Sequence, residues 1–227
     1  MTMRKRISYT VWPLAAIILL AALVGSYRSK PTASSAVPFL LIDPGHGGAD
    51  GGAIGGDGPL EKDINLAIAV PLADTLAVFG YPVTMTRDRD ASIHDEGVTT
   101  LRKQKISDMH NRLKLYEQAT LPVGIHQNFY PVSKYSGTQM FYAAAHPESR
   151  VLAEQIRQTV VSALQPDNTR ALKTGTDVFL LERTTRPAVF VECGFLSNPD
   201  ELSRLKTKEY QRKMALAVAV GVMQYDP

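Results

Sequence analysis

Three short apolar runs in the sequence each lead to an ionisable side chain. Residues 39–42 precede His46, residues 121–125 precede His126, and residues 188–191 precede Glu192. Apolar runs of this length, bounded by turn residues, predict buried β-strands. The carboxyl ends of parallel strands meet at one edge of a sheet, where ligands collect. The sequence therefore predicts that these three side chains lie together at strand ends.

A fourth candidate, Glu61, lies at the start of a helical pattern. Apolar residues recur at Ile64, Ile68, Leu72 and Leu76, and a carboxylate in a first helical turn is favoured by the helix dipole. The chain between His46 and Glu61 is rich in glycine, which lets a backbone approach a ligand closely. A flexible surface loop is the alternative. A phosphate-binding loop fits less well, because neither GK[ST] nor GxGxxG follows the strand.

These four side chains match the needs of a hydrolytic zinc centre. Such a centre has three protein ligands, leaves one position for water, and uses a nearby carboxylate to take the proton of that water. Asn128 and Asp43 are candidates for orienting the histidine rings. Glu192 has an alternative interpretation, as a core glutamate paired with Arg87 or Arg112, because a buried carboxylate needs a partner. We prefer a catalytic role, since a water-poor pocket raises the basicity of a carboxylate.

The remaining histidines and the lone cysteine are expected to have ordinary roles. The polar or helical surroundings of His94, His110 and His146 predict solvated side chains. Cys193 has no further histidine to activate it as a nucleophile, so we expect it to act as a small apolar residue. With one cysteine, the chain has no intramolecular disulfide.

The order of the patterns predicts one α/β domain with a twisted, mixed and mostly parallel β-sheet flanked by helices. Its zinc site is expected at the carboxyl-terminal edge of the strands. Beyond the first run, strands are predicted at residues 82–86, 122–125, 138–142, 177–181 and 188–191, and helices at 62–79, 147–164 and 208–224. A further helix is expected to carry Leu101, Ile106, Met109, Leu113 and Tyr116 on one side.

Two local features of the helices can also be predicted. Pro71 falls inside helix 62–79, where its ring and its missing N–H predict a kink. Residues 198–201 combine an N-cap asparagine, a proline at the first helical position and Glu201 placed for a capping box.

Six stretches of sequence resemble one enzyme family. They are DPGHGGADGGAIG, EKDINLAIA, MTRDRD, IHQN, GTQMFY and PAVFVECGFLSNPDE, spread over residues 39–222. Together they resemble the zinc-dependent N-acetylmuramoyl-L-alanine amidases, which cut the amide between muramic acid and the stem peptide of peptidoglycan. Gly124 and Cys193 depart from the family pattern, since a serine and an aliphatic or small residue are usual there.

The resemblance implies roles for the four candidate residues. His46, Glu61 and His126 would hold Zn²⁺, and Glu192 would be the catalytic carboxylate. The short length, the single apolar segment near the N-terminus and the stretch TRALKTGTDVFLLERTTRP are most similar to the germination-specific, spore-cortex branch. That branch implies formation of muramic δ-lactam in the cortex, with peptidoglycan as substrate.

Three other functions stay open from the sequence. The first is a general cell-wall amidase that acts in division or remodelling. The second is a partner-activated enzyme or a non-catalytic peptidoglycan-binding module, for which residues 88–105 offer a surface to an activating protein. The third is a zinc carboxypeptidase or aminopeptidase, which would need a pocket for a free peptide terminus.

The N-terminal residues predict export. Arg4, Lys5 and Arg6 precede the apolar stretch 11–25, a pattern typical of a signal peptide or a membrane anchor. We expect a signal or anchor segment at 1–28 that contacts the membrane, a linker at 29–37 and a catalytic domain at 38–227. The protein is expected outside the cytoplasm, either membrane-anchored or secreted.

The charge distribution argues against nucleic acid as a partner. The chain has a formal charge of +3, but its first 37 residues hold five basic residues and no acidic ones. The remainder has 20 Lys and Arg against 22 Asp and Glu, a net charge of −2. No basic stripe is dense enough to follow a phosphate backbone.

Overall fold

The computed structural model describes residues 39–56 and 58–225. The predicted signal or anchor segment at 1–28 and the linker at 29–37 lie outside these residues. The described residues belong to one structural unit. Among them, no helix has the length and apolar character needed to cross a membrane.

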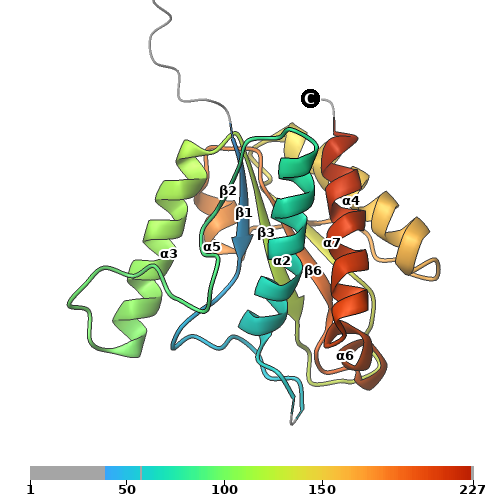
Figure 1. Cartoon of the computed structure of the whole chain (residues 1–227), viewed down its shortest axis with the longest axis horizontal. Helices are drawn as coiled ribbons and strands as arrows, with labels where there is room; N and C mark the ends of the chain where they lie inside the picture. The colour runs from blue at the N-terminus through green and yellow to red at the C-terminus, as the bar shows by residue number, and fades with distance from the viewer. Residues whose placement is uncertain (1–38, 57, 226–227) are drawn as a thin grey trace, which may run out of the picture. The chain divides into compact units, whose positions relative to one another are not determined.

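A six-stranded sheet forms the centre of the fold (Figure 1). Its order is β2-β1-β3-β6-β4-β5, and every neighbouring pair is parallel except β4 with β6. The strands are β1 (Leu40–Pro44), β2 (Val83–Met85), β3 (Leu121–Asn128), β4 (Gln139–Tyr142), β5 (Lys173–Thr174) and β6 (Val189–Phe195). The predicted mixed, mostly parallel α/β sheet is therefore confirmed.

Helices cover both faces of this sheet. On one side α2 (Glu61–Val78) and α4 (Pro147–Leu164) each contact α7 (Lys208–Met223). On the other side α3 (Leu101–Gln118) contacts the short helix α5 (Phe179–Arg183), whereas α6 (Pro199–Leu205) contacts β6 and α7, and its Leu205 belongs to the same apolar core as α2, α4 and α7. In Figure 1 the helices α2 and α7 lie in front of the strands.

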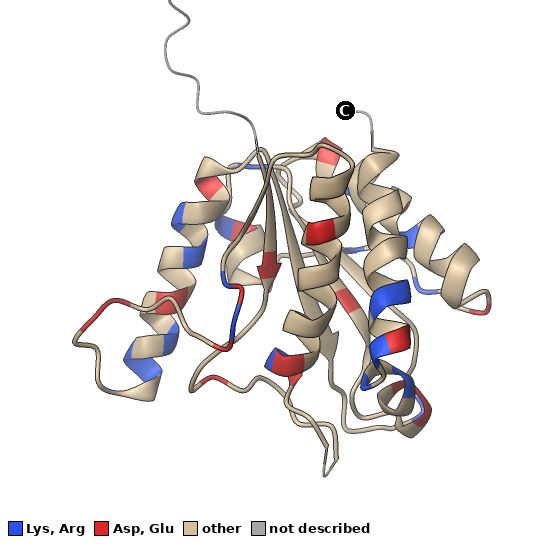
Figure 2. Ribbon diagram, in the orientation of Figure 1, with Lys and Arg blue, Asp and Glu red and all other residues tan. Residues whose placement is uncertain are grey.

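Successive side chains of a strand point to opposite faces of the sheet, so a separate apolar core forms on each face. Ile42 of β1 packs with Ile68 of α2 in the larger core, whereas the preceding residue, Leu41, packs with Tyr116 of α3 and Phe190 of β6 in the smaller one. His126 and Glu192, two of the candidate site residues described below, lie on the face of the smaller core. Figure 2 shows basic and acidic residues interspersed along the ribbon of α3, without a continuous basic stripe.

One predicted strand is wrong. Residues 177–181 do not join the sheet, because Phe179–Arg183 form α5 and the nearby strand is the two-residue β5. Leu180 and Leu181 are buried in the smaller core. A short apolar run of this kind does not distinguish a buried strand from a buried helical turn.

The predicted apolar side of α3 is also wrong in part. Leu101 and Ile106 are 49% and 50% exposed. The residues of α3 that become buried are Asp108, Arg112 and Tyr116. This helix faces the sheet with a hydrogen-bonded polar cluster, which hydrophobic periodicity does not detect.

The two local predictions for the helices have different outcomes. Asn198 caps α6, because its side chain accepts a hydrogen bond from the Glu201 backbone N–H, and Pro199 is the first helical residue. The capping box is wrong, since the Glu201 carboxylate accepts from the N–H groups of Gly137 and Phe195 instead. Helix α2 continues through Pro71 to Val78.

Candidate metal centre and active site

The loop that follows β1 carries His46 in an uncommon backbone conformation. His46 has φ of 63°, and it is the only described residue other than glycine with a positive φ. Such a conformation costs about 1–2 kcal/mol for an L-residue. Loop contacts must therefore hold it in place.

Two buried arginines supply these contacts. Arg87 donates from Nε to Pro44 O (3.0 Å) and from Nη2 to Gly45 O (2.9 Å). Arg112 donates from Nη1 to Pro44 O (3.1 Å) and from Nη2 to His46 O (2.7 Å). The planar guanidinium presents several donors in a fixed geometry, which suits three successive carbonyls. The arginines therefore fix the backbone that presents His46.

The Arg112 side chain is itself held by carboxylates. It forms ion pairs with Asp43 and with Asp108, and Asp43 also accepts hydrogen bonds from Thr86 and Tyr116. Burial tends to raise the pKa of Asp43, but the Arg112 charge and these hydrogen bonds hold it below its usual value. Asp43 is thus ionised and structural. The prediction that Asp43 orients a histidine ring is wrong, because its contacts are with Arg112, Thr86 and Tyr116.

The ring of His46 lies between two carboxylates. Its Nδ1 is 3.0 Å from Asp50 Oδ2 and its Nε2 is 3.2 Å from Glu61 Oε1. Burial lowers the pKa of His46, but the hydrogen bonds to Asp50 and Glu61 outweigh it and raise the pKa to about 9. Asp50 therefore orients the His46 ring, a role for which the sequence makes Asn128 and Asp43 the candidates. Its position four residues after His46, within the glycine loop, is the sequence signal that we missed.

Glu61 is the first residue of α2, and its carboxylate is fully engaged. Its Oε1 accepts from Gln127 N (3.1 Å) and its Oε2 from Ala53 N (2.9 Å). Asn65, one turn further along α2, donates to Oε1 at 3.4 Å. Burial opposes ionisation, but the hydrogen bonds with His126 and His46 hold the pKa of Glu61 well below its usual range. The carboxylate is charged at neutral pH, as a metal ligand must be.

His126 of β3 completes this group, and packing fixes its ring. Its Nδ1 is 3.2 Å from Glu61 Oε1, and the Phe190 ring stacks on it with centroids 4.6 Å apart and planes inclined by 14°. The departure from the family pattern at Gly124 now has a physical reason. A Cβ at Gly124 would lie 2.6 Å from the Phe190 ring, and one at Gly45 would lie 2.0 Å from the His126 ring.

The three side chains fit a zinc ion. One ligand atom from each of His46, Glu61 and His126 lies within 4.8 Å of the others. Both histidine nitrogens are 3.2 Å from the same carboxylate oxygen, close to the separation of about 3.3 Å between ligands 2.0 Å from a tetrahedral zinc. Two histidines and one glutamate are also a known ligand set for catalytic zinc. The donor chemistry and the spacing agree.

Glu192 lies beside this cluster. It is paired with His126 in the register of β3 and β6, so the two side chains point to the same face of the sheet. Its Oε2 is buried and has no hydrogen-bond partner among the described residues. Burial, assisted by the Glu61 charge and opposed by the histidines, raises the pKa of Glu192 to about 7. A carboxyl group with such a pKa can take up and release a proton near neutral pH.

The structure excludes an arginine partner for Glu192. The hydrogen bonds of Arg87 go to backbone carbonyls, and Arg112 binds carbonyls, Thr86 and the carboxylates of Asp43 and Asp108. The interpretation of Glu192 as a core glutamate held by either arginine is therefore wrong.

The predicted strand-end positions need one correction. His126 and Glu192 lie inside their strands, because β3 continues to Asn128 and β6 to Phe195. The apolar runs end earlier than the strands do, since polar side chains there face the open site. Cys193, the residue after Glu192, is buried on the other face of the sheet, in the larger core, and burial raises the pKa of its thiol. Its predicted apolar role agrees with this environment.

The other histidines do not join the metal cluster found among the described residues. His110 is exposed, as predicted, whereas His94 and His146 are partly buried. The Nδ1 of His94 is hydrogen-bonded to Ser92 Oγ at 2.8 Å.

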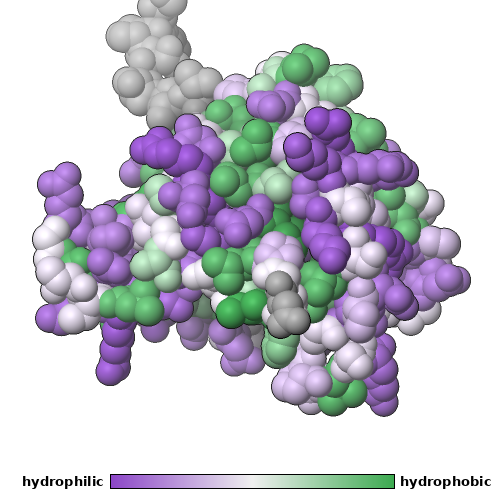
Figure 3. All heavy atoms as spheres, turned by 60° about the horizontal axis from the view of Figure 1, so that its bottom comes forward, coloured by the Kyte–Doolittle hydropathy of each residue, from purple (hydrophilic) through white to green (hydrophobic). Residues whose placement is uncertain are grey.

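A small cavity opens beside the metal ligands. It has a volume of about 70 Å³, and its lining includes His46, His126, Phe190, Met109 and Lys105. Lys105 pairs with Asp50 at 2.7 Å. Figure 3 brings this edge of the molecule forward and shows hydrophobic residues gathered near its centre, with hydrophilic ones over α3. Helix α3 thus forms a polar wall on one side of the site.

Comparison with known proteins supports the same fold. Residues 40–224 match the family model described as N-acetylmuramoyl-L-alanine amidase. The germination-specific N-acetylmuramoyl-L-alanine amidase of Bacillus subtilis is 35% identical over 230 residues, which cover 98% of this chain and 96% of that protein.

Two solved structures are also similar. The CwlD amidase of Clostridioides difficile, solved in complex with the GerS lipoprotein, has a TM-score of 0.80 at 35% identity and covers 83% of this chain and 98% of that one. An N-acetylmuramoyl-L-alanine amidase from Clostridium difficile 630 has a TM-score of 0.71 at 28% identity and covers 83% of this chain and 96% of that one. Since the family model spans nearly all of the described residues and the identity extends along the whole chain, this protein belongs to the N-acetylmuramoyl-L-alanine amidase family.

Proposed function

We propose that the chain hydrolyses the amide bond between the lactyl group of N-acetylmuramic acid and L-alanine in peptidoglycan. The observation that supports this most directly is the cluster of His46, Glu61 and His126 within 4.8 Å, with the unpartnered Glu192 oxygen beside it. Membership of the family supplies the bond that is cut.

Zinc on His46, Glu61 and His126 is part of this proposal. When bound, zinc supplies a Lewis acid with one coordination position open for water. The chain contributes the orientation of the ligands. Asp50 holds the far nitrogen of the His46 ring, and the N–H groups of Gln127 and Ala53 fix the Glu61 carboxylate. Such outer contacts hold ligands in the geometry that a metal requires.

Glu192 is the proposed proton carrier. Its raised pKa, about 7, allows the ionised carboxylate to accept a proton from the attacking water. The protonated group then donates to the departing amine of L-alanine, because an amine leaves poorly unless it is protonated. No other described group donates a hydrogen bond to its buried Oε2, so no donor competes with the water for that atom.

Within the family, we propose a role in the spore cortex. The extent of the identity with the germination-specific relative supports this role. The product would be muramic acid without its peptide, which a separate deacetylase would convert to muramic δ-lactam. A general cell-wall amidase is the second candidate, because an N-acetylmuramoyl-L-alanine amidase LytC of Bacillus subtilis is 32% identical over 82% of this chain.

We further propose that the protein works outside the cytoplasm with a protein partner. The substrate lies there, and residues 1–28 resemble a signal or anchor segment that contacts the membrane, followed by a linker at 29–37 and the catalytic domain at 38–227. The similar CwlD structure is a complex with a lipoprotein, which supports regulation by a partner in this chain.

Product analysis tests the proposed bond. The zinc-loaded chain is incubated with denuded peptidoglycan, and the soluble products are identified by mass spectrometry. Release of intact stem peptides with a free L-alanine amine is expected. Release of single amino acids from the peptide ends would indicate a peptidase and contradict the proposal. If stem peptides appear from cortex peptidoglycan and not from vegetative wall, the cortex role is supported over the general one.

A further inference from the structure

A second hollow lies on the same sheet face as Glu192, beyond the cavity next to the metal ligands. It has a volume of about 340 Å³ and is lined by Asn128, Tyr130, Tyr135, Phe141, Arg170, Lys173 and Phe195. None of these residues belongs to the site described above. Several of them are aromatic and two are cationic.

Strand register places this hollow beside the active site. In the pairing of β4 with β6, Phe141 lies opposite Phe190 and Gln139 lies opposite Glu192. In the pairing of β4 with β5, Lys173 lies opposite Phe141. Side chains at directly paired positions point to the same face. Lys173 is therefore two strands away from β6, about 10 Å to the side at 4.8 Å per strand. Asn128, two residues after the ligand His126, lines the near side of the hollow.

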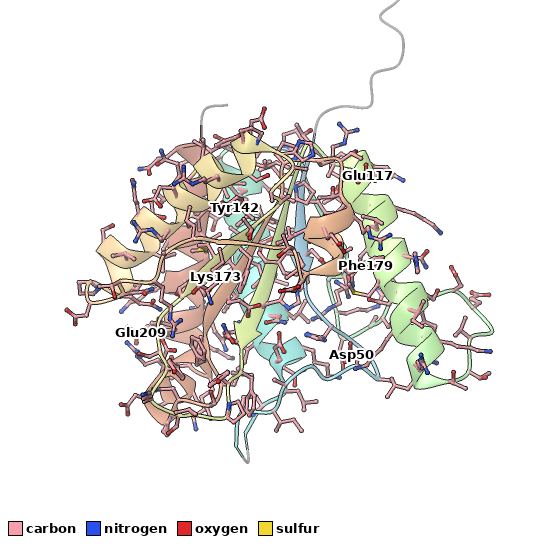
Figure 4. All side chains as sticks on the ribbon, turned by 180° about the vertical axis from the view of Figure 1, so that it is seen from behind. Asp50, Glu117, Tyr142, Lys173, Phe179 and Glu209 are labelled. Atoms are coloured by element: carbon pink, nitrogen blue, oxygen red, sulfur yellow. The ribbon has the colours of Figure 1, made fainter. Side chains whose placement is uncertain are left out.

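This part of the face is open to solvent. Helices α3 and α5 pack in the smaller core over Leu41 and Phe190, and Figure 4 shows Lys173 to one side of α3 and α5, away from Phe179 and Asp50. Lys173 is exposed, and Tyr130 and Tyr135 are 50% and 39% exposed. A ligand can thus enter along the sheet from the active site.

Two cations line the hollow, and one of them, Arg170, donates from Nε to Ser136 O at 2.6 Å. Among the described residues, neither Arg170 nor Lys173 has a carboxylate within 4 Å. The ion pairs found there involve other basic side chains. Each of these two cations lies over an aromatic ring instead, Arg170 at 4.5 Å from the Phe195 centroid and Lys173 at 5.8 Å from that of Phe141. Phe195 is buried and covered by the guanidinium. The accessible groups are these two cations and the exposed rings of Tyr130 and Tyr135, and the cations favour an anionic ligand over a neutral one.

We propose that this hollow is a subsite for the acidic stem peptide of the substrate, in which Lys173 and Arg170 bind carboxylates on residues that follow the scissile amide. The inference rests on the proposed amidase function. An extended peptide advances about 3.4 Å per residue, so its second to fourth residues span the distance from Glu192 to Lys173. Peptide carboxylates lie within this range, and they fit the two cations.

Kinetics on paired substrates test this subsite. Two muropeptides are compared, one with free side carboxylates on the second and third residues and one with both amidated. For Lys173→Gln, KM for the free-acid substrate is expected to rise about tenfold with kcat unchanged, the loss expected for one hydrogen bond to a charged group. KM for the amidated substrate is expected to stay the same. Arg170→Gln should behave alike, and Lys173→Arg should retain wild-type KM.

Lys208→Gln is the matched control, because Lys208 is an exposed lysine at the start of α7, on the opposite face. Equal KM changes for Lys208→Gln and Lys173→Gln would overturn the subsite, since net charge alone would then explain them. The subsite would also be overturned if the wild-type enzyme had the same KM for the free-acid substrate and for the amidated substrate.

Two further outcomes separate the alternatives. In the first, a phosphate polymer such as teichoic acid inhibits wild type but not Lys173→Gln, and amidation of the muropeptide has no effect on KM. This result would assign the hollow to anionic polymers and contradict a peptide subsite. Failure of the wild-type chain to cut either muropeptide would contradict the proposed function. In that case, calorimetric binding of the free stem peptide still tests the hollow, and loss of this binding in Lys173→Gln would support it.

Discussion

Gly124 occupies the middle of β3, a position where a side chain usually adds to the packing of a sheet. Here the absence of a Cβ leaves room for the Phe190 ring, which would lie 2.6 Å from that atom. Phe190 in turn stacks on His126. A residue without a side chain thus makes room for the ring that stacks on His126, a proposed metal ligand two positions further along the strand.

Gly124→Ala is therefore expected to weaken zinc binding. The new methyl group displaces Phe190 and loosens the His126 ring, and disturbed outer contacts commonly lower metal affinity by about 10–100-fold. The zinc dissociation constant, measured by competition with a chelator, reports the effect. Unchanged affinity in Gly124→Ala would show that the ring stack does not position His126.

Asp43 shows how a residue can support the site without touching the metal ligands' rings. Its charge is buried against Arg112, the residue that holds the Pro44 and His46 carbonyls. Arg112 keeps its ion pair with Asp108, so removing the Asp43 charge costs less than the loss of a sole partner, about 1.5–3 kcal/mol as for a hydrogen bond to a charged group. Asp43→Asn is expected to lower the free energy of unfolding by this amount at pH 7, as measured by urea denaturation.

The same pair predicts a pH dependence of stability. The pKa of Asp43 is lower in the folded protein than its ordinary value. Its contribution to stability is thus complete above the unfolded pKa of about 3.9 and is lost as pH falls through the folded pKa. Asp43→Asn should therefore lose less stability than wild type between pH 5 and pH 2. Asp74→Asn, which changes an exposed residue of α2, should keep the wild-type profile, and a wild-type profile in Asp43→Asn would contradict the account.

At the scale of elements, the loop between β1 and α2 depends on groups from distant parts of the chain. Arg87 follows β2 and Arg112 belongs to α3, yet both donate to the carbonyls that precede or belong to His46. Arg87 also donates to Lys62 O at 2.9 Å, in the first turn of α2. The Arg87 side chain thereby links the loop that carries His46 to the helix that carries Glu61.

Arg87→Lys tests this link. Lysine keeps the charge but lacks the planar set of donors, so the loop should lose its fixed geometry and zinc affinity should fall by about tenfold or more. Far-UV circular dichroism should remain native. Arg157→Lys is the control, because Arg157 pairs with Glu154 on the exposed side of α4. Equal zinc affinity in the two variants would contradict a positioning role for Arg87.

The sequence predicts most elements of the fold because apolar periodicity is strong in them. Helices α2, α4 and α7 and the central strands β1, β3 and β6 lie within a few residues of their expected positions. Prediction fails where local sequence is ambiguous or where polar contacts replace apolar ones. The run that contains Leu180 and Leu181 forms a helix, and α3 faces the sheet with Asp108 and Arg112.

The candidate site was predictable to a similar extent. The four candidate residues stand in distinctive local patterns, and the structure brings His46, Glu61 and His126 together with Glu192 opposite His126. Their roles remain predictions. Asp50 and the two arginines were missed as positioning groups, because their contacts depend on loop conformation, including the positive φ of His46, which no periodic pattern encodes.

At the scale of the whole molecule, the proposed zinc ion would join three separate parts of the fold. Its ligands come from the loop after β1, the start of α2 and the interior of β3. A ligand that binds only the folded state stabilises it by about 4 kcal/mol at a concentration of 1,000 Kd. For a domain of this size, the melting temperature should rise by about 8–16 °C.

Scanning calorimetry with and without zinc checks this expectation. The increase should depend on zinc concentration and disappear after treatment with a chelator. It should also be absent in His126→Ala, whereas His110→Ala, a change at an exposed residue of α3, should retain it. An identical increase in both variants would place zinc elsewhere.

The central claim is that Glu192 acts as the proton carrier beside a zinc ion held by His46, Glu61 and His126. Its most direct test compares wild type, Glu192→Gln and Glu209→Gln, each with its bound zinc quantified, in a muropeptide assay on denuded peptidoglycan. Glu209 is an exposed residue of α7 on the opposite face. We predict that Glu192→Gln binds one zinc but releases stem peptides about 10²–10⁴-fold more slowly, while Glu209→Gln matches wild type. Stem-peptide release at the wild-type rate by zinc-loaded Glu192→Gln would contradict the claim.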